Sequence, residues 1–247
     1  MNNVLNIKNL SKTYFTKLGT VDALNKINLD IKKGEILGII GSSGCGKSTL
    51  LSIIAKLDKS TNGEIISEKE DYIVGYMMQN DALFPWLTIL DNATLGLKIK
   101  GIKTKENIDY TIKLLETYGL KDFINKYPNS LSGGMKQRVA LIRTLAIKPD
   151  ILLLDEPFSK LDLITRLNIS DDVYKMIKEQ NQTTIIISHD IAECITLCDR
   201  VAIMTKRPGT IKNIHKIKLT NKTIPSKNRT DEKFYKYYDL LWKEIDK

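Results

Sequence analysis

The sequence predicts an α/β fold in which a core of parallel strands carries an N-terminal antiparallel β-subdomain and an inserted helical subdomain. Two kinds of pattern lead to this expectation. Residues 5–31 alternate apolar and polar side chains on either side of a turn at Gly19, a period of two that is typical of half-buried antiparallel strands. Uninterrupted apolar runs at 36–40, 151–154 and 184–187 are typical of parallel strands covered on both faces.

A helical insert is predicted between the first two of these runs. Over residues 90–127, apolar side chains recur at helical spacing, most clearly at Ile108, Ile112 and Leu115, and glycines interrupt the pattern. We therefore expect a helical subdomain at about residues 87–148.

The chain is expected to divide near residue 220, into a main domain over 1–220 and a tail over 221–247. Late in the tail, Phe234, Tyr238 and Leu241 fall on one stripe of a helix. The tail is therefore predicted to end in a helix that packs one apolar face.

Composition narrows the class of protein. The chain has 247 residues, 42% of them hydrophobic and 27% charged, and this balance is too apolar for a disordered chain. Charges or asparagines interrupt every apolar run before the ~20 residues of a membrane span, and the N-terminus lacks an export signal. Three cysteines are too few for a disulfide framework. We therefore expect a cytosolic protein.

The net charge is compatible with an anionic partner. A formal charge of +9 suits nucleic acid or an anionic membrane surface. However, lysines outnumber arginines 32 to 6 and are scattered along the chain, without the interleaved aromatic residues of a face that binds single strands. A solvated basic exterior is the simpler interpretation, and no nucleic-acid partner is expected.

One segment fits the Walker A pattern of nucleotide-binding loops. It comprises Gly41, Ser42, Ser43, Gly44, Cys45, Gly46, Lys47, Ser48 and Thr49. The segment leaves an apolar strand and enters a helix expected to bury Leu50, Leu51, Ile54 and Leu57, so backbone N–H groups and a helix N-terminus converge on one anion. Lys47 can reach the β- and γ-phosphates, and the Ser48 hydroxyl is placed to bind Mg²⁺. The alternative is a glycine-rich turn without a ligand.

A second motif is a buried strand, 151–154, that ends in two adjacent carboxylates, as a Walker B segment does. Because successive side chains of a strand point to opposite faces, the two carboxylates have different surroundings. Asp155 can hold Mg²⁺, directly or through water, while Glu156 can polarise the water that attacks the γ-phosphate. The alternative is a solvated acidic pair at a strand end.

A third motif opens a helix after residue 131. Ser132 precedes Gly133 and Gly134, which leave the helix N-terminus bare, a second device for binding an anion. Serine is also an ordinary N-cap. Leu-Ser-Gly-Gly followed by Gln-Arg, between Walker A and Walker B, resembles the signature motif of the ABC-family ATPases.

The resemblance extends over nearly the whole chain and implies the P-loop NTPase (RecA-like) core. It implies a role for four further residues. Gln79 resembles the Q-loop glutamine, which links Mg²⁺ and the attacking water to the helical lobe. Asp162 lies in a segment that resembles the D-loop, His189 matches the switch histidine on the γ-phosphate, and Tyr14 is placed like the aromatic that stacks on adenine. Taken alone, a histidine or a tyrosine would be interpreted as structural.

The wording of several segments narrows the resemblance to the ATPase subunits of nitrate, sulfonate and taurine importers. These segments are 83–88 (Leu-Phe-Pro-Trp-Leu-Thr), Met135, 155–158 (Asp-Glu-Pro-Phe) and 206–209 (Lys-Arg-Pro-Gly). The sequence departs from the family pattern in two places. Lys160 replaces the small residue usual in the D-loop, and the segment 63–79 is shorter than the usual hairpin.

The resemblance implies a subunit that hydrolyses ATP with Mg²⁺ to power uptake of a small anion. The working unit would be a head-to-tail dimer of this chain, in which the signature of one copy faces the ATP bound by the other. Separate membrane permease subunits would dock near residues 79–86, with a solute-binding protein as an indirect partner, at the cytoplasmic face of the cell membrane.

Two alternatives remain open at this point. A soluble ABC ATPase that acts on nucleic acid or ribosomes shares the catalytic motifs, although such proteins normally carry two nucleotide domains or a long coiled coil. The ATPase of an exporter with separate membrane subunits shares every catalytic motif. Only the segments 83–88 and 206–209 favour import over export.

Overall fold

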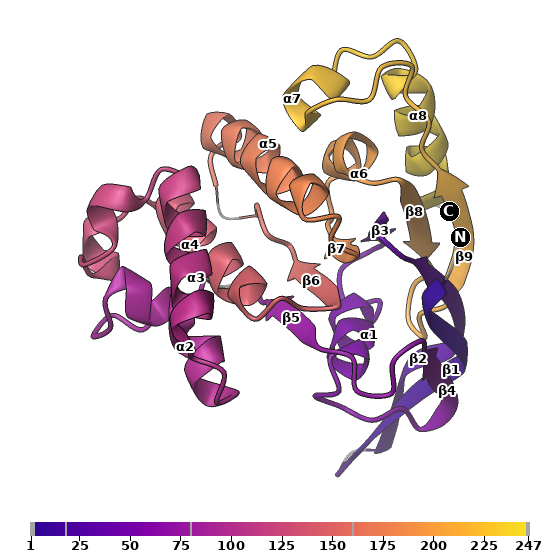
Figure 1. Ribbon diagram of the computed structural model, residues 1–247. Coiled ribbons are helices and arrows are strands. Elements are labelled where there is room, and N and C mark those ends of the chain that lie inside the picture. The colour runs from indigo at the N-terminus through magenta and orange to yellow at the C-terminus, as the bar shows by residue number, and fades with distance from the viewer. Residues whose placement is uncertain (1–2, 18, 80, 160, 246–247) are drawn as a thin grey trace.

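The computed structural model describes residues 3–17, 19–79, 81–159 and 161–245. Lys160, the unusual D-loop residue, lies outside them. The core is a six-stranded sheet in the order β5-β6-β7-β3-β8-β9 (Figure 1). Its strands are β3 (Ile36–Ile40), β5 (Val74–Met77), β6 (Ile151–Asp155), β7 (Thr184–Ile187), β8 (Arg200–Met204) and β9 (Ile211–Lys216).

The parallel core predicted from the apolar runs is confirmed. Strand β3 pairs in parallel with β7, and β7 pairs in parallel with β6. Every residue of these three strands is buried, because helices pack on one face of the sheet, and a helix and the antiparallel sheet described below pack on the other. Strand β9 differs, since it pairs antiparallel with β8 at the sheet edge and is only partly buried.

A second, antiparallel sheet of three strands precedes this core, as the alternating pattern predicts. Its order is β2-β1-β4, with β1 (Asn3–Thr16), β2 (Gly19–Lys32) and β4 (Asn62–Ser67). Leu5 of β1 lies opposite Ile31 of β2, and both are fully buried. Their apolar faces pack with Leu37 of β3, which joins the two sheets through one hydrophobic core.

Helix α1 (Lys47–Ile54) follows β3 and is shorter than expected. Leu50, Leu51 and Ile54 are buried as predicted. Leu57 was expected on the same face, but this was wrong, since its side chain is 70% exposed. The helix ends because Lys56 takes a left-handed backbone conformation, with φ of 59°, which turns the chain away before Leu57.

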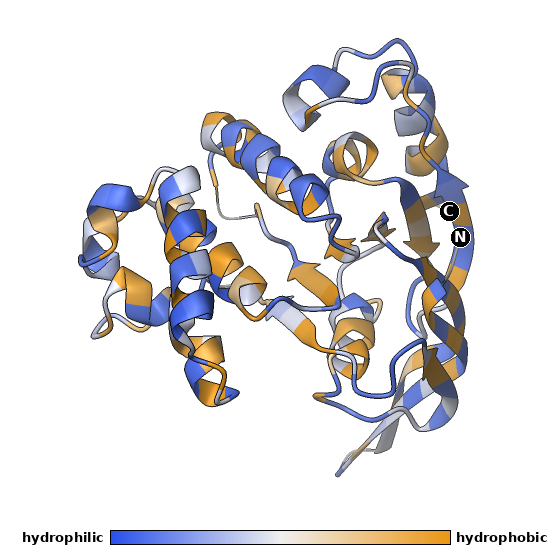
Figure 2. Cartoon of the chain, in the orientation of Figure 1, coloured by the Kyte–Doolittle hydropathy of each residue, from blue (hydrophilic) through white to orange (hydrophobic). Residues whose placement is uncertain are grey.

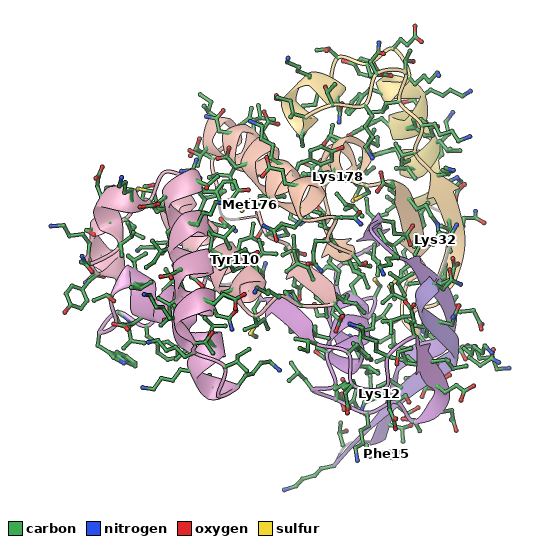
Figure 3. The ribbon with its side chains drawn as sticks, in the orientation of Figure 1. Lys12, Phe15, Lys32, Tyr110, Met176 and Lys178 are labelled. Carbon is green, nitrogen blue, oxygen red and sulfur yellow. The ribbon has the colours of Figure 1, made fainter. Side chains whose placement is uncertain are left out.

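Helices gather beside the sheet edge formed by β5 (Figure 1). They are α2 (Ile89–Ile99), α3 (Lys105–Thr117), α4 (Gly133–Ala146) and the short 3₁₀ turns η1 (Lys121–Phe123) and η2 (Pro128–Ser130). Thr88 and Thr104 cap the first two helices through their side chains. Tyr110 of α3, labelled in Figure 3, donates a 2.6 Å hydrogen bond to Gln180 and ties this group to the end of the helix at 163–179.

The remaining helices come from the C-terminal half of the chain. They are α5 (Leu163–Glu179), α6 (Ile191–Leu197), α7 (Pro225–Asn228) and α8 (Phe234–Ile245). Figure 2 shows helix faces turned to the sheets in orange and outer faces largely in blue. Phe234 and Leu241 of α8 are buried and Tyr238 is half-buried, so the predicted apolar stripe forms. Among the described residues, no helix combines the length and hydrophobicity that a membrane crossing requires.

Candidate active site

The loop 41–49 connects β3 to α1 and has the shape of an anion cradle. Gly44 and Gly46 take left-handed conformations, with φ of 72° and 108°. A Cβ added at Gly46 would lie 2.8 Å from the carbonyl oxygen of Ala23, so only glycine fits there. Because the first turn of α1 contains no acidic side chain, its positive end is available to a negative ligand.

The ammonium group of Lys47 lies inside this loop. Its side chain is buried, and Nζ donates hydrogen bonds to the carbonyl oxygens of Gly41 at 2.8 Å and Ser42 at 3.0 Å. The loop therefore holds a positive charge at a fixed place before any ligand arrives.

Asp155 ends β6 beside the loop, and its carboxylate is buried. Tyr76 of β5 donates to it at 3.3 Å, and Ser48 of α1 also hydrogen bonds to it. Burial raises the pKa of Asp155, against the opposing effects of Ser48 and Tyr76. Burial, together with the charge of Asp155, raises the pKa of Tyr76 to about 12. A hydroxyl and a carboxylate oxygen, both suited to a hard cation, are thus brought together.

Glu156 is held between two side chains from neighbouring strands. Gln79 follows β5 and donates from Nε2 to the Glu156 carboxylate at 2.9 Å, while Nδ1 of His189, after β7, lies 3.4 Å from the same oxygen. Glu156 has φ of 48°, a left-handed conformation that turns its side chain away from the strand direction. Ser159 stabilises this turn by donating its N–H and its hydroxyl to the Glu156 carbonyl, at 3.3 and 3.1 Å.

A cavity of about 420 Å³ opens at this place. It is lined by Tyr14, Val21, Ala23, Ser43, Gly44, Gly46, Lys47, Ser48, Thr49, Glu156 and Arg207. The Tyr14 hydroxyl donates to Asp58 at 2.9 Å, and Lys12, labelled in Figure 3, places Nζ 4.7 Å from the centre of the ring. Tyr14 is therefore fixed at the rim of the cavity.

The signature residues Ser132, Gly133 and Gly134 lie elsewhere, as does Asp162. Ser132 caps α4 by accepting a 3.3 Å hydrogen bond from the Met135 N–H; Ser132 and Gly133 are exposed, and Gly134 is buried. Asp162 caps α5 by accepting from the Thr165 N–H at 3.0 Å, and hydrogen bonds with Thr165 lower its pKa. None of these four is among the described residues that line the cavity. The fold thus unites Walker A, Walker B, Gln79 and His189 but leaves the signature on a separate surface.

The structure adds cavity residues that the sequence did not indicate. Val21 and Ala23 come from β2, and Arg207 comes from the turn between β8 and β9. Arg207 belongs to the Lys-Arg-Pro-Gly segment, whose only signal was a family resemblance, since no local pattern places that turn beside the loop 41–49.

The sequence profile of the ABC transporter family matches residues 24–159. An uncharacterized ABC transporter ATP-binding protein of Bacillus subtilis, YtlC, is 40% identical over 98% of this chain and 95% of its own length. The chain belongs to the ABC transporter family. As a member of its ATP-binding branch, the protein binds and hydrolyses ATP.

Further relatives of this ABC ATPase include proteins named for import. The nitrate import ATP-binding protein NrtD of Synechocystis is 39% identical over 96% of this chain and 93% of its own length. The aliphatic sulfonates import ATP-binding protein SsuB of Bacillus anthracis is 38% identical over 93% and 91%. A dimeric structure of MJ0796, described as a bacterial ABC transporter cassette, superposes with a TM-score of 0.73 at 35% identity, covering 87% of this chain and 99% of that one. The predicted P-loop NTPase fold is therefore confirmed.

Proposed function

We propose that this ABC ATPase powers the import of a small anion of the nitrate, sulfonate or taurine type through separate membrane permease subunits. The observation that carries the ATPase chemistry is the Glu156 carboxylate, held between Gln79 and His189 beside the loop 41–49. The names of NrtD and SsuB, matched over most of both chains, support import rather than export or work on nucleic acid.

We assign roles to the cavity residues from their positions. Lys47 and the backbone of the loop 41–49 bind the β- and γ-phosphates, and Tyr14 stacks on adenine at the rim. Glu156 is the general base for the attacking water. His189 contacts the γ-phosphate and Gln79 orients the water, because both already reach the base at 3.4 and 2.9 Å.

We assign a Mg²⁺ site to Ser48 and Asp155, with the side-chain oxygen of Gln79 as a further ligand. Among the described residues, no three His, Cys, Asp or Glu side chains gather into a metal cage. A sparse protein ligand set suits Mg²⁺ in a nucleotide complex, where phosphates and water complete the shell. When bound, this ion neutralises charge on the β- and γ-phosphates.

We propose a head-to-tail dimer as the working unit. Ser132 and Gly133 are exposed and lie outside the cavity of their own chain, as residues that complete a site in a second copy must. Gly134 and Asp162 would join them at that interface. The dimeric MJ0796 structure shows that a cassette of this fold can pair.

We place the protein at the cytoplasmic face of the membrane, bound to permease subunits that receive solute from a binding protein. Trp86 is 69% exposed and Phe84 38%, and their rings lie 5.2 Å apart in a loop before α2, an apolar surface suited to a protein partner. We further propose that residues 1–220 form the ATP-binding domain, with a helical insert at about 87–148, and that residues 221–247 form a tail.

Lys47→Ala is expected to weaken ATP binding about ten- to a hundredfold, because it removes the buried ammonium from the phosphate site. Direct titration with a non-hydrolysable ATP analogue measures the effect. Lys105→Ala, which removes an exposed lysine from the start of α3, is the matched control. Equal affinities in the two variants would contradict the role of Lys47.

The dimer is tested by crosslinking Ser43→Cys in one copy to Ser132→Cys in another, since both positions are exposed. The native Cys45 is fully buried and unsuitable. In a Glu156→Gln background, we expect ATP-dependent crosslinked dimer on a denaturing gel. Pairing Ser43→Cys with Thr117→Cys, exposed at the end of α3, should give none. An ATP-binding protein that forms no Ser43–Ser132 product would exclude the head-to-tail geometry.

A further inference from the structure

The turn between β8 and β9 packs against the loop 41–49. Its Gly209 donates to the carbonyl oxygen of Ala23 in β2 at 3.0 Å and accepts from the N–H of Asn25 at 2.9 Å, so the turn forms a parallel bridge beside β2. A Cβ added at Gly209 would lie 2.2 Å from the carbonyl oxygen of Cys45. The backbone of this turn therefore approaches the loop 41–49 as closely as glycine allows.

This contact places Arg207 at the cavity wall. Its Nε donates a 3.1 Å hydrogen bond to the carbonyl oxygen of Gly44, at the outer bend of the loop. Within the described part of the chain, this is the only hydrogen bond that Arg207 makes, and no ion pair includes it. The two terminal nitrogens of the guanidinium are thus left without a protein partner beside a cavity built for a polyanion.

The charges in the cavity favour a contact between the terminal nitrogens of Arg207 and a bound anion. Of the residues that the structure describes, three charged ones line the cavity, namely Lys47, Arg207 and Glu156. The Lys47 ammonium already donates two of its hydrogens to the carbonyls of Gly41 and Ser42. ADP and ATP bring about three to four negative charges, and a guanidinium binds phosphate oxygens with two parallel hydrogen bonds.

We propose that Arg207 is a second cationic nucleotide-binding residue, which uses Nε to hold the bend of the loop at Gly44 and its terminal nitrogens to bind the phosphate chain. Lys47 supplies the buried charge, and Arg207 supplies an exposed one on the outer side of the loop. Because its charge is exposed to solvent, its contribution depends on ionic strength.

The test separates the two uses of the side chain. In Arg207→Gln, the amide nitrogen is bonded to Cδ as Nε is in arginine, so the hydrogen bond to Gly44 can be kept while the charge and the terminal nitrogens are lost. Arg207→Met removes both. Lys206→Gln removes the neighbouring exposed charge, which does not line the cavity. The probe is ADP, which the protein does not hydrolyse.

We expect Arg207→Gln to weaken ADP binding about tenfold at about 0.05 M salt, with a smaller difference at about 0.5 M salt. Arg207→Met should lose at least as much, and Lys206→Gln less than about twofold. The melting temperature of Arg207→Gln without nucleotide should stay at the wild-type value, because the loop keeps its brace.

Three outcomes would overturn the proposal. Wild-type ADP affinity in Arg207→Gln, with a loss confined to Arg207→Met, would reduce Arg207 to a brace for the loop. A loss in Arg207→Gln that does not shrink with salt would exclude a charge contact with the phosphates. An equal loss in Lys206→Gln would show a general effect of basic charge near the cavity instead of a specific contact.

Discussion

Replacement of Glu156 by glutamine is expected to lower the kcat of ATP hydrolysis by about 10²- to 10⁴-fold while ATP still binds. The amide has nearly the same shape as the carboxylate but cannot take a proton from the attacking water. It can still accept from Gln79 at the position where the carboxylate accepts a 2.9 Å hydrogen bond. The measurements are steady-state phosphate release and direct titration with ATP.

The matched control is Glu64→Gln, which neutralises an exposed carboxylate on β4 and should leave both quantities unchanged. Turnover at the wild-type rate in Glu156→Gln would remove Glu156 from the role of base. Loss of ATP affinity in the same variant would show that the carboxylate serves binding, contrary to its assignment.

The second large effect is expected for Phe84→Ser combined with Trp86→Ser, which should weaken association with the membrane subunits at least about a hundredfold. Aromatic anchors contribute ~2 kcal/mol or more each to a protein interface, and the two losses together exceed the ~2.8 kcal/mol that a hundredfold change requires. The measurement is co-purification with the permease subunits in detergent, followed by titration of the purified partners.

The loop around these rings should survive the substitutions. Buried Asn92 accepts from the N–H of Phe84 at 2.8 Å and donates to the carbonyl oxygens of Phe84 and Leu87, each at 3.1 Å. Since these bonds involve only backbone atoms of the loop, serine can replace both rings without removing them. We therefore expect ATPase activity and melting temperature of the isolated double variant to match the wild type.

The control is Phe15→Ser with Trp242→Ser, which removes one exposed phenylalanine and one exposed tryptophan elsewhere on the surface. Phe15 lies at the far end of the β1–β2 hairpin, where Figure 3 labels it, and Trp242 lies on α8. Equal retention of the permease by both double variants would place docking elsewhere. A large fall in melting temperature for Phe84→Ser with Trp86→Ser would assign these rings to the core of the helical subdomain.

The sequence predicts the central strands of this fold well, because a strand that is buried on both faces has a continuous run of apolar residues. The strands 36–40, 151–154 and 184–187 are apolar apart from Thr184, and each lies in the parallel part of the six-stranded sheet. The end of α1 is less predictable. Leu57 continues the apolar spacing of the helix, but a left-handed residue at position 56 ends it, and lysine gives no signal of that conformation.

The candidate site divides in the same way. The residues of the loop 41–49 are contiguous in sequence, so the motif alone predicts the conformation of the loop. Gln79, Glu156 and His189 lie close together because β5, β6 and β7 are neighbours in the sheet. This strand order cannot be inferred from the local sequence around each residue. Gln79 and His189 were predicted through family resemblance alone, whereas Glu156 was predicted from the two carboxylates that end the strand 151–154. Arg207 was missed as a cavity residue because its turn reaches the loop only through the pairing of β8 with β9 and its contact with β2.

The exposed position of Ser132 and Gly133, outside the cavity of their own chain, bears on how the cell limits wasted ATP. On the head-to-tail arrangement proposed above, a free subunit carries only half of each composite site. Two subunits free in dilute solution meet rarely, whereas two bound to one permease, as proposed above, would share an effective concentration of about millimolar. Binding to the permease would then confine ATP hydrolysis to assembled transporters. Unassembled copies of the chain would remain nearly idle without any separate inhibitor.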